Sequence, residues 1–150
     1  MKMFEFSLQR VLDAKLAVEE SLEIRLGNAQ RHLDVSLRKL DSIRERRARE
    51  ARRVADLKGR HVSARELASG SGYLQWVEKE MARQTDEVRQ REKEVDAVRR
   101  EWMVAMKERK TFERLKEKER LEWRYEQNRK EQKDLDDLTS AVFYRQRQRV

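Results

Sequence analysis

The chain contains few side chains of the types that carry out acid–base or metal chemistry. His32 and His61 are its only histidines, and neither has a second metal-ligating residue four positions away, the spacing of helical zinc motifs. Cysteine is absent, which excludes disulfides, zinc–thiolate sites and thiol nucleophiles. The sequence also lacks the glycine patterns of phosphate-binding loops and of nucleophile turns. We therefore expect no catalytic residue, no cofactor and no metal site, and we predict that the chain is not an enzyme.

One run of basic residues could bind an acidic partner. The segment Arg44–Arg53 contains six arginines and two glutamates, and such a cluster could neutralise the phosphates of a nucleic acid. The alternative is a solvated helix face, because Glu45 and Arg49 stand at the i, i+4 spacing that supports a helix. No aromatic residue for base stacking interrupts the arginines. The helix-face interpretation is favoured, and a module that binds nucleic acid or another acidic partner remains the alternative function.

The composition indicates that long helices position these side chains. Charged residues make up 44% of the 150 and hydrophobic residues 37%, with a net charge of +8, so one compact globular core is not expected. The chain has no proline and only four glycines, the residues that usually mark turns. No apolar run approaches the roughly 20 residues of a membrane-spanning helix, and no apolar stretch of a secretory signal follows Met1. A cytoplasmic location is expected.

The spacing of apolar residues predicts an all-α fold, two long helices forming an antiparallel coiled-coil hairpin. Ser69-Gly70-Ser71-Gly72 is the one apparent break, and it predicts a turn at 69–72 between an arm of about 3–68 and an arm of about 73–147, in a single domain of residues 1–150. From Leu22 to His61 a stripe repeats at alternating steps of four and three, the spacing of a heptad. Upstream the stripe continues through Leu8, Val11, Lys15 and Val18, with a stutter between Val18 and Leu26.

A turn at 69–72 fixes which residues should meet. Antiparallel partners should then have residue numbers that sum to about 141. The expected pairs are Leu26 with Leu115, Ala29 with Phe112, Lys15 with Glu126, Phe6 with Leu135 and Met3 with Leu138. On this pairing the hairpin closes along its whole length, and polar seam residues such as Lys15 and Arg109 help to set the register. A dimer of two chains is the alternative, but the central break favours one chain folding back, so the chain is expected to be monomeric on its own.

Two groups of apolar residues are candidate docking surfaces. Tyr73, Trp76 and Val77 follow the expected turn, where they either cap the hairpin or bind a partner. At the other end, apolar residues stand beside arginines and either close the hairpin or enter a partner lined with acidic residues. This second group includes Phe4, Phe6, Leu135, Leu138, Val142, Phe143 and Tyr144, with Arg145 and Arg147 following.

Four segments, taken in order, resemble one known family. They are Phe4-Glu5-Phe6-Ser7-Leu8, Tyr73-Leu74-Gln75-Trp76-Val77, the charged stretch 107–120 around Phe112-Glu113-Arg114-Leu115, and the stretch 131–138 that ends at Leu138. Their order and spacing over nearly the whole chain resemble the flagellar export protein family FliJ. The stalk proteins of virulence-type secretion systems are similar in design, and the Phe-x-Phe start favours the flagellar branch.

The resemblance implies a non-enzymatic stalk or adaptor of the flagellar type III export apparatus. Its implied partners are the hexameric export ATPase ring, the cytoplasmic domain of the export gate and export chaperones that it passes along, with no small-molecule substrate. The location would be cytoplasmic, peripheral to the inner-membrane apparatus. By resemblance, the gate-binding residues would be Tyr73, Trp76, Val77, Glu80 and Arg83, and the ATPase-ring-binding residues would be Phe4, Phe6, Leu8, Leu135, Leu138, Arg145 and Arg147. Glu80 and Arg83 stand where the family can have apolar or small residues.

Overall fold

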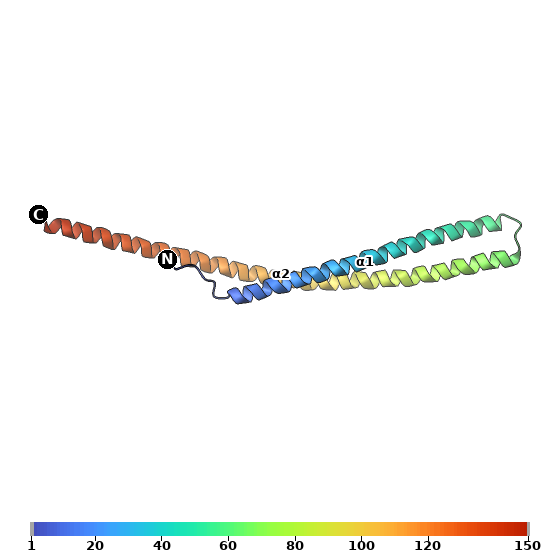
Figure 1. Ribbon diagram of the computed structural model, residues 1–150, viewed down its shortest axis with the longest axis horizontal. Helices are drawn as coiled ribbons and strands as arrows, with labels where there is room; N and C mark the ends of the chain where they lie inside the picture. Colours follow the sequence, from blue (N-terminus) through green and yellow to red (C-terminus); the bar gives the residue numbers. More distant parts are fainter. Residues whose placement is uncertain (1, 150) are drawn as a thin grey trace. The chain divides into compact units, whose positions relative to one another are not determined.

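Two long helices make up almost all of the protein. The computed structural model describes residues 2–149, so residues 1 and 150 of the expected domain lie outside the described part. Helix α1 spans Gln9–Lys58 (50 residues) and helix α2 spans Ala64–Gln148 (85 residues), and the described range contains no strand (Figure 1). The two helices pack against each other as an antiparallel pair. This arrangement confirms the predicted all-α helical hairpin.

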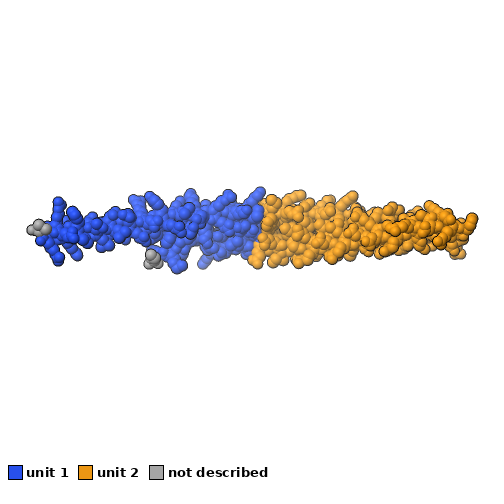
Figure 2. Space-filling model, turned by 90° about the horizontal axis from the view of Figure 1, so that it is seen from above, with its two compact units in different colours: residues 1–19, 105–150 blue, residues 20–104 orange. Residues whose placement is uncertain are grey.

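The chain divides into two compact units, and each takes a stretch from both helices. Unit 1 comprises Met1–Glu19 and Ala105–Val150, and unit 2 comprises Glu20–Val104 (Figure 2). Unit 2 contains the connection between the helices, whereas unit 1 contains the start of α1 and the second half of α2. Each unit is therefore built on contacts between residues far apart in the sequence.

The connection between the helices lies ten residues before the predicted turn. Ser69–Gly72 is inside α2, so the turn at 69–72 and the arms of 3–68 and 73–147 are wrong. Helix α1 ends where Gly59 N donates a hydrogen bond to Asp56 O at 3.1 Å, and α2 begins after Ser63, whose Oγ accepts one from Glu66 N at 3.2 Å. A serine followed three residues later by a glutamate is the capping-box sequence. This helix-start signal, rather than the glycine pair, marks the turn.

Gly70 contributes to packing instead of reversing the chain. It is buried in α2, and a Cβ built on it would lie 3.3 Å from Val54 Cγ2 and 3.6 Å from Leu57 Cδ1 of α1. No glycine among the described residues has a positive φ, so the left-handed conformation expected for a helix end is not used. The missing side chain lets the two helices approach closely.

The earlier turn also changes the register throughout the hairpin. In unit 2, Arg47 Nη2 lies 3.2 Å from Glu78 Oε1, and Gln84 Nε2 donates to the buried Ser36 carbonyl oxygen at 3.0 Å. Partner numbers sum to about 125 and not to about 141. Lys15 accordingly pairs with Glu108, at 2.8 Å, instead of Glu126. The other expected pairs are wrong for the same reason: Leu26 with Leu115, Ala29 with Phe112, Phe6 with Leu135 and Met3 with Leu138.

The buried stripe of α1 follows the predicted heptad only in its second part. Leu22, Leu40, Ile43 and Val54 are buried, as the pattern predicts. Nearer the N-terminus the buried residues are Leu12 and Glu19, whereas the side chains of Val11 and Val18 are 38% and 51% exposed. The positions Leu12, Lys15, Glu19 and Leu22 continue the alternating steps without interruption, so the predicted stutter is wrong.

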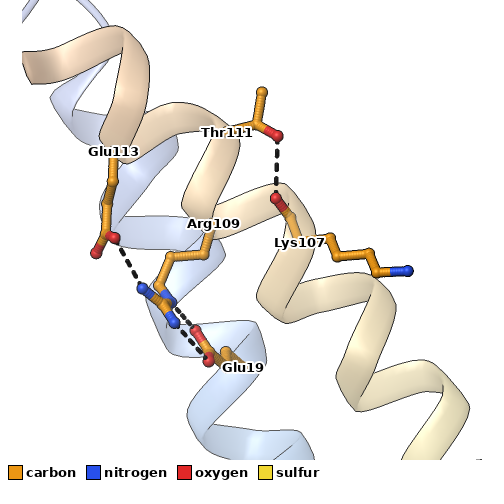
Figure 3. Close-up of polar contacts among 5 residues, drawn as sticks. All are labelled: Glu19, Lys107, Arg109, Thr111 and Glu113. Carbon is orange, nitrogen blue, oxygen red and sulfur yellow. Dashed lines mark hydrogen bonds and ion pairs between the residues drawn. The ribbon is translucent and has the colours of Figure 1, made fainter.

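A buried ion pair explains why a glutamate occupies this stripe. Arg109 of α2 donates from Nε and Nη2 to the two carboxylate oxygens of Glu19, and Nη1 donates to Glu113 Oε2 at 2.8 Å (Figure 3). The side chain of Glu19 is 9% exposed and that of Arg109 is 19% exposed. The hydrogen bonds that Arg109 donates to the carboxylates of Glu19 and Glu113 raise the pKa of Arg109 above its ordinary value. The pair gives the seam of unit 1 one polar, directional layer.

Candidate partner-binding surfaces

The N-terminal segment packs on α2 through its two phenylalanines, whereas Met3 and Leu8 are exposed. Phe6 is 7% exposed, and the ring of Phe4 lies 6.0 Å from that of Trp123 at an angle of 53°. Ser7 Oγ donates to Glu119 Oε1 at 2.9 Å, which fixes the segment beside α2. Of the three residues expected here to bind the ATPase ring, Leu8 is the one that is exposed, at 38%. Phe4 and Phe6 therefore hold this segment on the hairpin.

The C-terminal segment of α2, residues 131–148, presents several exposed apolar side chains. Every residue in it is exposed, so no other described part of unit 1 covers it, and Figure 1 shows α2 continuing as a single helix past the N-terminal segment. Leu135 is 58% exposed, Leu138 63% and Val142 55%. Arg147 lies over the ring of Phe143, with 5.9 Å from Cζ to the ring centroid. The predicted residues Leu135, Leu138, Arg145 and Arg147 are thus all exposed on this segment.

This surface is separate from the phenylalanines that were expected to complete it. Phe4 contacts Trp123, twelve positions before Leu135, because the register differs from the predicted one. Tyr125, 69% exposed, lies next to that contact and was missed by the sequence analysis. In the predicted register, the neighbouring residue Glu126 paired with Lys15 of the other arm. Tyr125 was therefore expected to lie within the closed hairpin, and its exposure was not predicted.

A second exposed aromatic group lies in unit 2. The rings of Tyr73 and Trp76 stack, with centroids 5.8 Å apart and planes 21° apart, and the two side chains are 40% and 51% exposed. Val77 is fully buried and packs in the seam. The sequence left open whether this group closes the hairpin or binds a partner. In the structure Val77 closes the hairpin, and the stacked pair of Tyr73 and Trp76 is free to bind a partner.

Of the two charged residues near this aromatic pair, Glu80 forms an ion pair and Arg83 is exposed. Glu80 Oε2 lies 3.3 Å from Arg46 Nη1 across the hairpin, so its carboxylate is already engaged. Arg83 is exposed. Of the five expected gate-binding residues, the structure thus presents Tyr73, Trp76 and Arg83 at the surface, while Glu80 links the helices.

The arginine cluster of α1 is largely neutralised by acidic side chains. Four of its six arginines form ion pairs, two of them across the hairpin: Arg44 with Asp41, Arg46 with Glu80, Arg47 with Glu78 and Arg53 with Glu50. An arginine paired in this way has less net charge to offer a phosphate. The contacts favour the helix-face interpretation over a nucleic-acid interface.

The described residues contain no arrangement typical of a reactive site. No group of three or more His, Cys, Asp or Glu side chains within residues 2–149 could hold a metal ion. The ring of His32 lies beside Arg91, 3.5 Å from Nδ1 to Nη1, and has no carboxylate partner there. None of the helices described is long and apolar enough to cross a bilayer. The exposed apolar side chains include the Tyr73–Trp76 pair in unit 2 and those of residues 131–148 in unit 1.

The fold is that of a coiled-coil hairpin protein with exposed apolar side chains in both of its units. The family model of the flagellar FliJ protein matches residues 3–148, nearly the whole chain, and the protein belongs to this family. The resemblance drawn from the four sequence segments is thereby confirmed. Membership makes the protein a component of the flagellar type III export apparatus, in a family whose role there is not enzymatic. No curated protein and no solved structure gives a significant match.

Proposed function

We propose that the protein is a stalk or adaptor that binds the hexameric export ATPase ring and links it to the cytoplasmic domain of the export gate. Two observations support a link between partners: the exposed surfaces lie in different units, and neither contains groups arranged for chemistry. Binding to the gate would place the protein peripherally at the inner-membrane apparatus. Contact with export chaperones belongs to the same proposal, through whichever surface the ring or the gate leaves free.

The observation that carries the proposal is the uncovered C-terminal segment. Leu135, Leu138 and Val142 expose more than half of their side chains, and Arg145 and Arg147 stand beside them. Apolar anchors with flanking arginines are enriched at protein interfaces. We assign this segment and Leu8 to the ATPase ring, with Phe4 and Phe6 holding the N-terminal segment in place.

The stacked pair Tyr73 and Trp76 is the proposed contact for the gate. Aromatic side chains bury a large area at a small cost in conformational entropy, which makes them frequent hot spots. Exposed Arg83 lies on the same helix and can contribute, whereas Val77 supports the pair from the seam.

The division between the two surfaces can be tested with two variants that preserve the hairpin. We expect Leu135→Asp with Leu138→Asp to weaken binding to the purified ATPase hexamer by about tenfold or more, and to leave binding to the gate domain unchanged. Tyr73→Ala with Trp76→Ala should have the opposite effect. Binding constants from titrations of each variant against each partner provide the measurement.

Equal losses from both variants with both partners would contradict the assignment. A wild-type protein that binds neither partner, but binds nucleic acid with an affinity that falls steeply with salt, would instead support the alternative function. Circular dichroism of each variant serves as the control, because all four substituted side chains are largely exposed and helix content should not change.

A further inference from the structure

The C-terminal segment of α2 has the features of a helix that lacks its partner. Residues 131–148 are helical, yet all of them are exposed. An isolated helix of this length is marginal in water, because helices in proteins are stabilised mainly by packing an apolar face. Leu135, Leu138 and Val142 stand at steps of three and four, which places them on one face at the positions of a coiled-coil seam. The segment therefore carries a seam that nothing else in unit 1 uses.

The charges along this segment are arranged in blocks. An acidic block precedes the centre of the apolar face and a basic block follows it, with Lys133 the one base inside the acidic block. The acidic residues are Glu131, Asp134, Asp136 and Asp137, and the basic block consists of Arg145, Arg147 and Arg149. The four acids and four bases between 131 and 149 cancel. A partner that is only acidic, such as an anionic membrane surface, would be repelled by the first block.

A second copy of this segment, running in the opposite direction, would place its basic block beside the acidic block of the first copy. We propose that the C-terminal segment pairs with the same segment of a second copy of this chain, antiparallel about a two-fold axis near Ser140. Leu138 of one copy then faces Val142 of the other, Leu135 faces Arg145, and Lys133 faces Arg147. Taken as blocks, residues 131–137, with a net charge of −3, lie along residues 143–149 of the other copy, with a net charge of +3. Glu131 of one copy comes opposite Arg149 of the other. A symmetric contact of this kind uses one surface twice and closes on itself.

The charge order also selects the antiparallel direction over the parallel one. In a parallel pair each block would face its own copy, and like charges facing each other destabilise coiled coils and set partner choice. The contact is confined to fewer than three heptads, which is below the size of a standard interface of roughly 800 Å² per partner. We therefore expect a weak, reversible dimer with a dissociation constant of about 10–100 µM.

This inference stands apart from the proposed function. It replaces the expectation that the free chain is monomeric, and it does not require the ATPase ring or the gate. The ATPase ring and the second copy would compete for this segment. The dimer must therefore dissociate before the ring can bind. Failure of the dimer leaves the ring assignment untouched, because self-association and ring binding are measured separately.

Charge-swapped variants of the full chain test the proposal. One variant carries Asp134→Lys, Asp136→Lys and Asp137→Lys, and the other carries Arg145→Glu, Arg147→Glu and Arg149→Glu. Sedimentation velocity from about 5 to 500 µM should show concentration-dependent dimers for the wild-type chain and a loss of dimer of about tenfold or more in each variant alone. An equimolar mixture of the two variants should recover the dimer. A monomeric wild-type chain over this range, or two variants that dimerise alone as well as the wild type does, would overturn the proposal.

Single cysteines test the geometry cleanly, because the chain has none of its own. Ala141→Cys flanks the proposed axis and should form an inter-chain disulfide with itself. Gln132→Cys should not crosslink to itself, but should crosslink to Gln146→Cys when the two variants are mixed. Self-crosslinking of Gln132→Cys as efficient as that of Ala141→Cys would indicate a parallel pair and reject the antiparallel dimer.

Discussion

At the scale of single residues, the ion pair between Glu19 and Arg109 is the contact with the clearest energetic consequence. Removing one member of a nearly buried pair leaves the other charge without its partner, whereas replacing both by apolar residues is often neutral or stabilising. We expect Glu19→Leu to lower the melting temperature by about 3–8 °C. The loss is limited because Arg109 keeps its ion pair with Glu113.

The double variant Glu19→Leu with Arg109→Leu provides the matched comparison. It should melt within about 2 °C of the wild type or above it, as measured by thermal denaturation followed by circular dichroism. Glu113→Gln serves as the control for an exposed partner, since its side chain is 47% exposed and exposed pairs contribute little. A single variant as stable as the wild type would show that the pair contributes nothing to the hairpin.

At the scale of the helices, the register follows from where α1 ends and how closely α2 approaches it. Gly70 packs closely against α1, and the Cβ position built on it lies 3.3 Å from Val54 Cγ2. Cγ2 branches from the Cβ of Val54 as a cysteine Sγ would, so this contact brings the two positions within reach of a disulfide, whose Cβ atoms lie about 3.5–4.5 Å apart. Val54→Cys with Gly70→Cys should therefore form an intra-chain disulfide, which mass spectrometry of the oxidised, alkylated protein detects.

The competing register has its own diagnostic pair. Ala29→Cys with Phe112→Cys would crosslink within the chain if the helices turned at 69–72, and it should not do so with the turn between Lys58 and Ala64. Detection of the 29–112 disulfide together with loss of the 54–70 disulfide would show that the chain reverses at Gly70 after all.

At the scale of the whole chain, the difference in length between the helices determines which part is needed for folding. Helix α2 has 85 residues and α1 has 50, so the end of α2 has no counterpart in α1. Deleting residues 131–150 removes only exposed side chains from the described part, and we expect the melting temperature to change by less than about 2 °C. Helix content measured by circular dichroism should fall with the number of residues removed.

A deletion at the other terminus is the contrasting case. Removing residues 2–7 takes away buried Phe6 and the contact of Phe4 with Trp123, and should lower the melting temperature by about 3–6 °C. The order of the two effects is the test: a C-terminal deletion that destabilises more than the N-terminal one would mean that residues 131–148 support the hairpin.

The sequence by itself determined the fold class, the heptad stripe from Leu22 to Leu57 and the family. The fold class and the stripe follow from composition and local spacing, because a chain without proline whose apolar residues repeat at steps of three and four can bury them only by pairing helices. The family follows from the resemblance of four segments, taken in order. The candidate surface residues Tyr73, Trp76, Leu135 and Leu138 were also predictable as apolar residues near the ends of the arms, and all four are exposed.

The tertiary structure alone decided the turn, the register and the role of each of these residues. A glycine inside a helix and a glycine ending one look alike in a sequence, and only the approach of Val54 shows that Gly70 is of the first kind. Nothing in the sequence distinguished Glu19 from other glutamates, and its role follows from Arg109 lying opposite it. Phe6 was expected to bind the ATPase ring, but it is buried. The physical reason is that a heptad repeat fits its partner equally well after a shift of whole heptads. Capping, close packing and one buried ion pair, which depend on both helices together, select among those shifts.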